Sequence, residues 1–208
     1  MLDRARELRE FWFGRLPLSA PRLEERMQFW FGGDDEEETT QRERDALLRA
    51  RFEPLVIDAA QGKLAAWADS PRRRLSLILL LDQLPRNLYR ATARAYATDE
   101  RALGLALSGI QSGGDAALDV VERIFFYMPL QHAESLEAQD ESVAAYRRLL
   151  DETPEALRAG LANVLRHAEA HRAVVLRFGR FPHRNRILGR PTNPDELEYL
   201  HRERPPGV

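Results

Sequence analysis

The sequence has no cysteine in its 208 residues. Disulfides, thiolate metal sites and cysteine nucleophiles are therefore excluded. Long apolar runs are also missing, because the longest, LSLILLL at Leu75–Leu81, is too short to span a bilayer. The N-terminal stretch MLDRARELREFWFG mixes acids with bases and has no apolar core of signal-peptide length. We therefore expect a cytoplasmic protein with no membrane partner.

The sequence also lacks a large excess of positive or negative side chains. Lysine and arginine together number 31 and aspartate and glutamate 33, which gives a formal net charge of −2. A near-neutral chain does not offer the extended basic footprint that nucleic-acid binding needs, so we expect no nucleic-acid partner. The chain also has no G-x-G-x-x-G, P-loop or G-x-S-x-G motif. These absences argue against a glycine-rich phosphate loop and against a serine nucleophile at a strand-to-helix elbow.

What the sequence does contain is helix signals. Apolar residues recur at the three-and-four spacing of a helix face, and no segment alternates long enough to predict a strand. Short connections favour antiparallel neighbours, so we expect an all-α, multi-helix antiparallel bundle forming one domain over residues 1–208. The acidic run Asp34–Glu38 suits a helix N-terminus. The motif FWFG occurs twice, at Phe11–Gly14 and Phe29–Gly32, and predicts two aromatic helix ends that pack into one core.

Prolines predict where these helices break. Pro54 lies inside a long helical pattern and should kink or split it. Pro85 should end the apolar helix that precedes it, and Pro129 should end the next apolar helix. The second break would place His132 near the N-terminus of the following helix.

The densest cluster of positive side chains lies where Gly179 and Pro182 predict another helix end. The segment VLRFGRFPHRNRILGR, Val175–Arg190, has five arginines and a histidine in sixteen residues and no acid. Its larger part, RFGRFPHRNRILGR at Arg177–Arg190, is the last of three polar blocks. The other two are LDQLPRNLYR at Leu81–Arg90 and YMPLQHAESLEAQ at Tyr127–Gln139.

These three blocks resemble the signature segments of a bacterial family, domain of unknown function 924 (DUF924). The strings REFWFG and GKLAAW (Gly62–Trp67) are similar as well, and the resemblance runs from about Glu7 to Leu200. It implies an all-α fold of the tetratricopeptide-like superfamily and brings no established activity. Leu84 and Gln131 depart from the family pattern, both at packing positions, so neither departure affects the polar residues.

We expect the three blocks to meet as one polar cleft inside the apolar bundle. Histidine moves protons near neutral pH, and arginine matches carboxylate and phosphate in two-pronged geometry. The candidate catalytic residues are His132, His183 and Glu134. The candidate binding residues are Asp82, Arg86, Asn87, Gln139, His171, Arg180, Arg184 and Asn185.

Two interpretations of these residues stay open. In the structural one, arginines cap carbonyls freed by Pro85 and Pro182 and bridge to Asp82 and Glu134. In the functional one, the arginines converge on an anionic ligand beside a histidine. The first functional hypothesis is a binding or scaffold protein with one polar cleft. The alternatives are an enzyme acting on a small anionic metabolite, phosphate or carboxylate, and a tetratricopeptide-like groove that reads the C-terminal carboxylate of a peptide.

A metal site is the third option for the same residues. His132, Glu134, His171 and His183 supply the right ligand types for zinc, iron or manganese. Their spacing matches no dedicated signature, because these four residues form neither an H-E-x-x-H motif nor an E-x-x-H pair. We therefore expect no metal and no cofactor.

Overall fold

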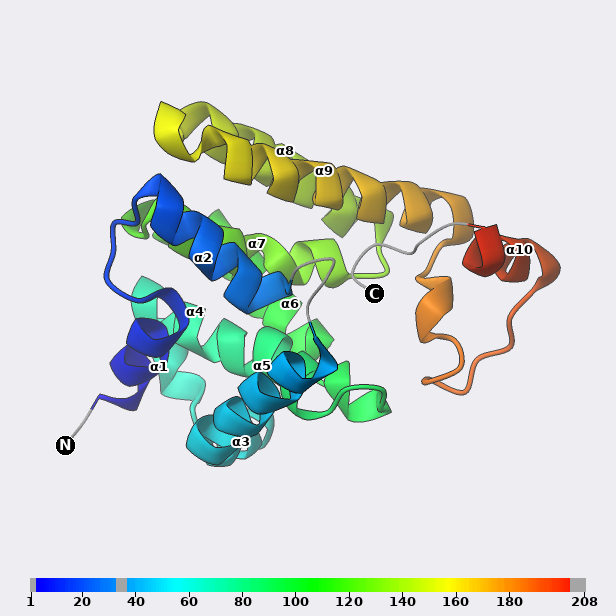
Figure 1. Ribbon diagram of the computed structural model, residues 1–208, viewed down its shortest axis with the longest axis horizontal. Helices are drawn as coiled ribbons and strands as arrows, with labels where there is room; N and C mark the ends of the chain where they lie inside the picture. Colours follow the sequence, from blue (N-terminus) through cyan, green and yellow to red (C-terminus); the bar gives the residue numbers. More distant parts are fainter. Residues whose placement is uncertain (1–2, 33–36, 203–208) are drawn as a thin grey trace.

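The computed structural model describes residues 3–32 and 37–202, and within these ranges it is all-α with no strand (Figure 1). The α-helices are α1 (Arg4–Phe13), α2 (Ala20–Phe31), α3 (Glu38–Ala60), α4 (Pro71–Ile78), α5 (Leu84–Leu88), α6 (Asp99–Gln111), α7 (Val120–His132), α8 (Leu136–Glu152), α9 (Glu155–Phe178) and α10 (Pro194–Arg202). The shorter helical turns are η1 (Ala65–Asp69), η2 (Leu79–Gln83), η3 (Ala93–Ala95), η4 (Gly114–Ala117) and η5 (Pro182–Arg184). Of the predicted acidic helix start, residues 34–36 lie outside the described ranges, while Glu37 is the N-cap of α3.

Side-chain caps fix several helix starts. Asp119 begins α7 in a capping box, with its carboxylate accepting from the Val121 amide at 3.0 Å and Glu122 accepting from the Asp119 amide at 3.1 Å. Asn193 and Glu196 form the same reciprocal pair at the start of α10, both at 2.9 Å. Each cap satisfies amides that have no partner inside the helix.

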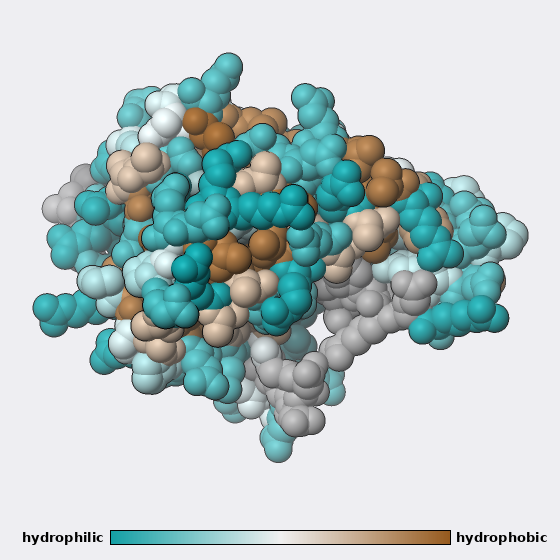
Figure 2. Space-filling view, turned by 90° about the horizontal axis from the view of Figure 1, so that it is seen from above, coloured by the Kyte–Doolittle hydropathy of each residue, from teal (hydrophilic) through white to brown (hydrophobic). Residues whose placement is uncertain are grey.

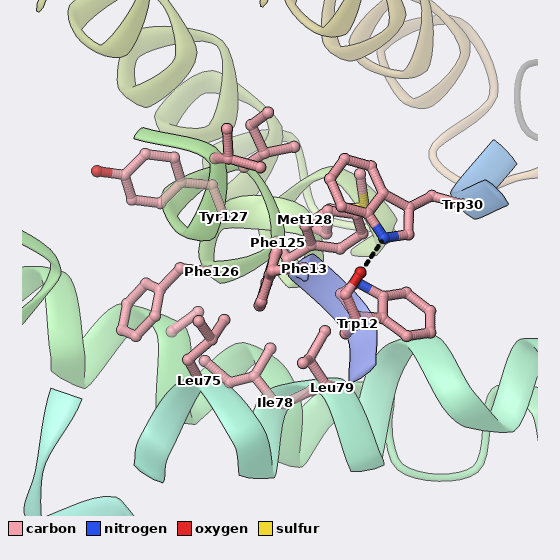
Figure 3. Packing of buried hydrophobic residues seen from close by; sticks show 14 of the residues in the cluster. Trp12, Phe13, Trp30, Leu75, Ile78, Leu79, Phe125, Phe126, Tyr127 and Met128 are labelled. Atoms are coloured by element: carbon pink, nitrogen blue, oxygen red, sulfur yellow. Dashed lines mark hydrogen bonds between the residues drawn. The ribbon is translucent and has the colours of Figure 1, made fainter. Parts of the chain in front are cut away.

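The FWFG ends of α1 and α2 pack together in the core, as their shared motif predicts (Figure 3). The indole Nε1 of Trp30 donates to the carbonyl of Trp12 at 2.9 Å, and the Trp30 ring lies 4.6 Å from the ring of Phe125 in α7. The α4–η2 segment closes this core from below in Figure 3 with Leu75, Ile78 and Leu79. Burying each such side chain contributes roughly 1.5–3 kcal/mol, so this cluster is a principal source of stability.

Pro54 does not split α3, which is continuous from Glu38 to Ala60. The reason is exposure: Pro54 lies on the outer side of the helix. The carbonyl that its missing N–H leaves unpaired can therefore bond to water.

Pro85 does not end its helix, and this prediction was wrong. The chain continues from α4 through η2, a π-helical turn, into α5, with the Leu84 amide donating to the Leu79 carbonyl. Pro85 has no N–H for the Leu81 carbonyl four residues earlier. The hydroxyl of Thr98 donates to that carbonyl instead, at 2.5 Å. The wider turn and a neighbour's hydroxyl thus accommodate the proline.

Pro129 likewise lies inside its helix, since α7 runs from Val120 to His132. Burial of every residue from Ile124 to Gln131 holds the helix across the proline. The predicted position of His132 is corrected as a consequence. It is the last residue of α7, and α8 begins only at Leu136, after the N-cap Ser135.

The long helices α8 and α9 form an antiparallel pair along one side of the molecule, with α7 packed beneath them (Figure 1). Ion pairs such as Arg147–Glu169 at 2.7 Å join the two helices, and Figure 2 shows a largely hydrophilic face there with small hydrophobic patches.

Within the described ranges, no helix combines the length and apolar character that crossing a membrane requires. The tetratricopeptide-like architecture stays a prediction.

After α9 the chain turns back along the end of the bundle before it reaches α10 (Figure 1, orange to red). A small second core anchors this part, formed by Val174, Val175, Phe181 and Tyr199. We call residues 179–193, which contain η5, the return segment. It brings the third polar block against the end of α7.

Candidate functional site

His132 and Asp82 are joined directly, although they come from different polar blocks. Nδ1 of His132 lies 2.9 and 3.0 Å from the two carboxylate oxygens of Asp82. Asp82 is completely buried in the π-helical turn η2, and His132 is 14% exposed at the end of α7. The inner member of the pair is therefore sealed in the core, while the outer one reaches the surface.

Asp82 stays ionised in spite of its burial. Burial alone would raise the pKa of its carboxyl, but the charge of Arg86 and the hydrogen bond from His132 outweigh it and hold the pKa well below its usual value. The amide of Gln83 also donates to this carboxylate, at 2.5 Å. A charged carboxylate in the core is tolerated because each of its oxygens is paired.

His132 is neutral near pH 7. Burial lowers its pKa most, and the charge of Arg86 lowers it further, against the opposing effect of Asp82. Because ionised Asp82 can only accept, the single ring proton resides on Nδ1 and is donated to Asp82. Nε2 then carries a lone pair, and it has no hydrogen-bond partner within residues 3–32 and 37–202.

Arg86 is held by a second carboxylate that sequence reasoning missed. Its guanidinium donates to both oxygens of Asp99, at 3.0 and 2.8 Å, and to the Asp82 backbone carbonyl at 2.5 Å. Asp99 is the first residue of α6, so the sequence shows it only as a helix start. Burial, together with the charge of Asp82, raises the pKa of Asp99.

Arg184 brings the third polar block to the same place. Its guanidinium donates to the carbonyl of His132 at 3.1 Å and lies 4.4 Å from the ring centroid of Phe181 and 4.7 Å from that of Tyr96. Arg184 is 6% exposed, and its buried Nε has no hydrogen-bond partner among the described residues. We call Asp82, Arg86, Asp99, His132 and Arg184 the His132 site.

His171 lies next to this site. Its ring is 6.3 Å from that of His132, and its Nδ1 donates to the carbonyl of His167 at 2.7 Å. Burial, followed by the proximity of His132, lowers the pKa of His171 to about 3. Its ring is therefore neutral at pH 7, like that of His132.

The other candidate residues support the site from outside it. Gln139 is completely buried and donates to the carbonyls of Gln131 and Ala133, at 2.6 and 2.8 Å, so it caps the end of α7 that carries His132. Glu134 accepts from Arg190 at 2.5 and 2.9 Å and from the Phe181 amide at 2.8 Å. It thereby ties the return segment to the α7–α8 connection.

Arg180 and Asn185 hold α10. Arg180 donates to both oxygens of Glu196, at 2.6 and 2.9 Å, and Asn185 donates to Glu196 at 3.2 Å. Glu196 is 1% exposed and is another residue that sequence reasoning missed as a partner. Its place three residues after Asn193, the spacing of a capping box, was the available signal.

Asn87 and His183 differ in where they lie. Asn87 donates to Asp45 of α3 at 3.0 Å, which places it away from the His132 site. His183 lies close enough for the charge of Arg184 to act on it. Burial first, and then that charge, lower the pKa of His183 to about 4. Its buried Nδ1 has no partner among the described residues.

Two surface hollows lie away from this site. One surface hollow of about 500 Å³ lies along α3 at Arg49 and Ile57, and one of about 490 Å³ lies between α8 and α9 at Asp140 and Arg172. In the part of the chain that the structure describes, no three or more histidine or acidic side chains are grouped so as to hold a metal ion. The His132 site is thus a set of converging side chains at the end of α7.

The chain is thus an all-helical protein in which an aspartate–histidine pair is flanked by arginines. The chain belongs to the DUF924 family, described as bacterial protein of unknown function, whose model matches residues 8–204. It is also similar to the solved structure of a protein of unknown function from Agrobacterium tumefaciens. That likeness has 38% sequence identity and a TM-score of 0.70, and it covers 88% of this chain and 97% of the other. A comparison with curated proteins gives no match.

Proposed function

We propose that this protein is an enzyme that acts on a hydroxyl group of a small anionic molecule, with His132 as the general base and Asp82 as the residue that orients it. The observation that carries the proposal is the hydrogen bond from Nδ1 of His132 to buried Asp82, at 2.9 Å, which leaves Nε2 without a partner in the described chain.

A general base must be unprotonated, fixed in direction and within reach of the substrate. His132 meets the first condition because burial and Arg86 lower its pKa. Asp82 supplies the second, as the aspartate of a hydrolytic triad does for its histidine. The 14% exposure of the His132 side chain supports the third.

Asp82 does not itself act as the base. It is completely buried, and its low pKa makes it a weak proton acceptor. Its role in the proposal is to select the Nδ1–H tautomer and to stabilise the imidazolium that forms when Nε2 takes a proton. Arg86 in turn keeps Asp82 ionised.

The helix-end interpretation also has support. Arg184 donates to the His132 carbonyl at the end of α7, and Arg86 contacts both the backbone carbonyl and the carboxylate of Asp82. Arg180 and Arg190 are bonded to Glu196 and Glu134, and Gln139 caps α7. These contacts favour stability and disfavour a peptide groove in which the same arginines would read a carboxylate. They do not involve Nε2 of His132, and general-base catalysis is the use that we propose for it.

The test is conversion of a panel of small hydroxylated carboxylates and phosphates, followed by proton NMR, with wild type and His132→Gln compared. The exposed His201→Gln is the matched control. The proposal expects turnover by wild type and by the control, and a loss of at least about 100-fold in kcat for His132→Gln. Equal turnover by His132→Gln and wild type, or no conversion of any panel member, overturns it.

A further inference from the structure

Two buried polar atoms beside the His132 site have no partners. Arg184 Nε and His183 Nδ1 come from consecutive residues of η5, and neither atom has a hydrogen-bond partner in the described part of the chain. Buried polar atoms in folded proteins are nearly always paired, so an unpaired one needs a reason. A bound ligand would supply the missing partner of Arg184 Nε, and that of His183 Nδ1 when this nitrogen carries the ring proton.

Arg184 is held rigidly for such a role. Its guanidinium lies against the rings of Phe181 and Tyr96, at 4.4 and 4.7 Å from their centroids. One of its terminal nitrogens donates to the carbonyl of His132 at 3.1 Å. The guanidinium is therefore fixed in position relative to His132. It loses little further conformational freedom when a ligand binds.

The surrounding charges leave Arg184 without a carboxylate of its own. Arg86 is paired with Asp99 in two-pronged geometry, and Arg190 is paired with Glu134 in the same way. The nearest carboxylate that contacts Arg184 is this same Asp99, at 3.6 Å. Of these three arginines, Arg184 thus makes the weakest ion pair.

This arrangement favours a singly charged, planar anion. The Nε–H of Arg184 and the ring of His183, in its Nδ1–H form, can each donate to one oxygen of a carboxylate. A phosphate dianion needs more donors and more positive charge than one partly matched guanidinium provides. Carboxylate is therefore the better fit.

The acceptors at the site define the rest of the ligand. Nε2 of His132 is a lone-pair acceptor, and so is Nε2 of His171, because the Nδ1 proton of His171 is donated to His167. The two rings are 6.3 Å apart. A cationic donor on the ligand, such as an ammonium group, would be repelled by Arg86 and Arg184. The group of the ligand that donates to these nitrogens is therefore a neutral hydroxyl.

We infer that the ligand of the His132 site is a small hydroxycarboxylic acid, whose carboxylate binds Arg184 Nε and His183 while its hydroxyl donates to His132 Nε2. The inference rests on the proposed function and adds the substrate class and the carboxylate subsite. It makes His183 a binding residue, in contrast to the catalytic role that the sequence predicted for it.

The experiment is isothermal titration of the intact protein with matched probes: glycolate, acetate, ethylene glycol and phosphoglycolate, and then lactate against propionate. We expect each hydroxy acid to bind at least about tenfold more tightly than its partner without the hydroxyl, and also more tightly than the diol and the phosphate ester. Equal affinity for acetate and glycolate, or a preference for phosphoglycolate, overturns the inference.

Variants locate the carboxylate. Arg184→Gln and His183→Asn are each expected to weaken glycolate binding by about tenfold, and Arg186→Gln, at an exposed neighbouring position, is expected to leave it unchanged. His183→Asn keeps the test decisive if Arg184→Gln fails to fold. Unchanged binding by folded His183→Asn overturns the subsite.

Failure of this inference is distinguishable from failure of the proposed function. If a phosphate ester is the substrate and His132→Gln loses turnover, the base stands and the carboxylate subsite falls. If hydroxy acids bind through Arg184 but His132→Gln turns them over normally, the subsite stands and the base falls.

Discussion

Asp82 and His132, which lie 50 residues apart in the sequence, share a hydrogen bond of 2.9 Å between a completely buried carboxylate and the Nδ1 of a partly exposed imidazole. The pair joins the π-helical turn η2 to the C-terminus of α7. Buried Asp82 thereby determines which nitrogen of the partly exposed His132 ring carries the proton.

Asp82→Asn is expected to lower the free energy of unfolding by about 1.5–3 kcal/mol, because it removes the charged acceptor shared by His132, Gln83 and Arg86, while Arg86 keeps its pair with Asp99. Urea unfolding measures the change. The control, Asp140→Asn, removes an exposed partner of Arg172 and should cost no more than about 1 kcal/mol. Similar losses for the two variants would show that Asp82 is not held as described.

Gln139→Leu is expected to cost about 1–3 kcal/mol, since it leaves the carbonyls of Gln131 and Ala133 buried without their donor. Thermal or urea unfolding checks this value. Gln111→Leu, at an exposed position at the end of α6, serves as the matched control and should be nearly neutral. A neutral Gln139→Leu would contradict the capping role.

Stability is expected to fall as the pH drops below about 6.5. The unfolded chain protonates His171 near its ordinary value of 6.5, whereas burial keeps the folded ring neutral until about pH 3. Between these values the unfolded state binds more protons, so this ring contributes stability that is present above pH 6.5 and is lost at about 1.4 kcal/mol per pH unit on acidification.

The measurement is the free energy of unfolding by urea at several pH values from 7 to 4. His171→Gln should show a shallower dependence than wild type, and His201→Gln, exposed in α10, should match wild type. Parallel curves for wild type and His171→Gln would remove His171 as the source of the slope.

Glu196→Ala is expected to loosen α10 without unfolding the main bundle. Glu196 accepts from Arg180, Asn185 and the Asn193 amide, and α10 otherwise rests on a small separate core. Hydrogen exchange should accelerate in residues 194–202 and stay unchanged in α7 and α8. Uniform acceleration across all helices would indicate that α10 unfolds only with the whole protein.

The sequence predicts the helices well and their ends less well. Periodic apolar residues identify the all-α class, but Pro85 and Pro129 were misread as helix ends. What a proline does depends on its surroundings: the Thr98 hydroxyl replaces the missing donor beside Pro85, and burial carries α7 across Pro129. Such partners are distant in sequence, so local patterns do not reveal them.

The site shows the same limit. Its polar blocks were identifiable from composition and from the family resemblance, and the structure brings Asp82, His132 and Arg184 together. Asp99 carried no signal beyond that of a helix start, although it binds Arg86 through both oxygens. Asn87, which looks like part of the same block, turns instead to Asp45.

The most direct test of the account is the tautomer of His132, measured by long-range proton–nitrogen NMR of the imidazole rings at pH 7, with assignment by His132→Gln. We expect a neutral ring with the proton on Nδ1 and an unprotonated Nε2. A proton on Nε2, or an imidazolium with both nitrogens protonated, would contradict it, because His132 would then have no lone pair to offer.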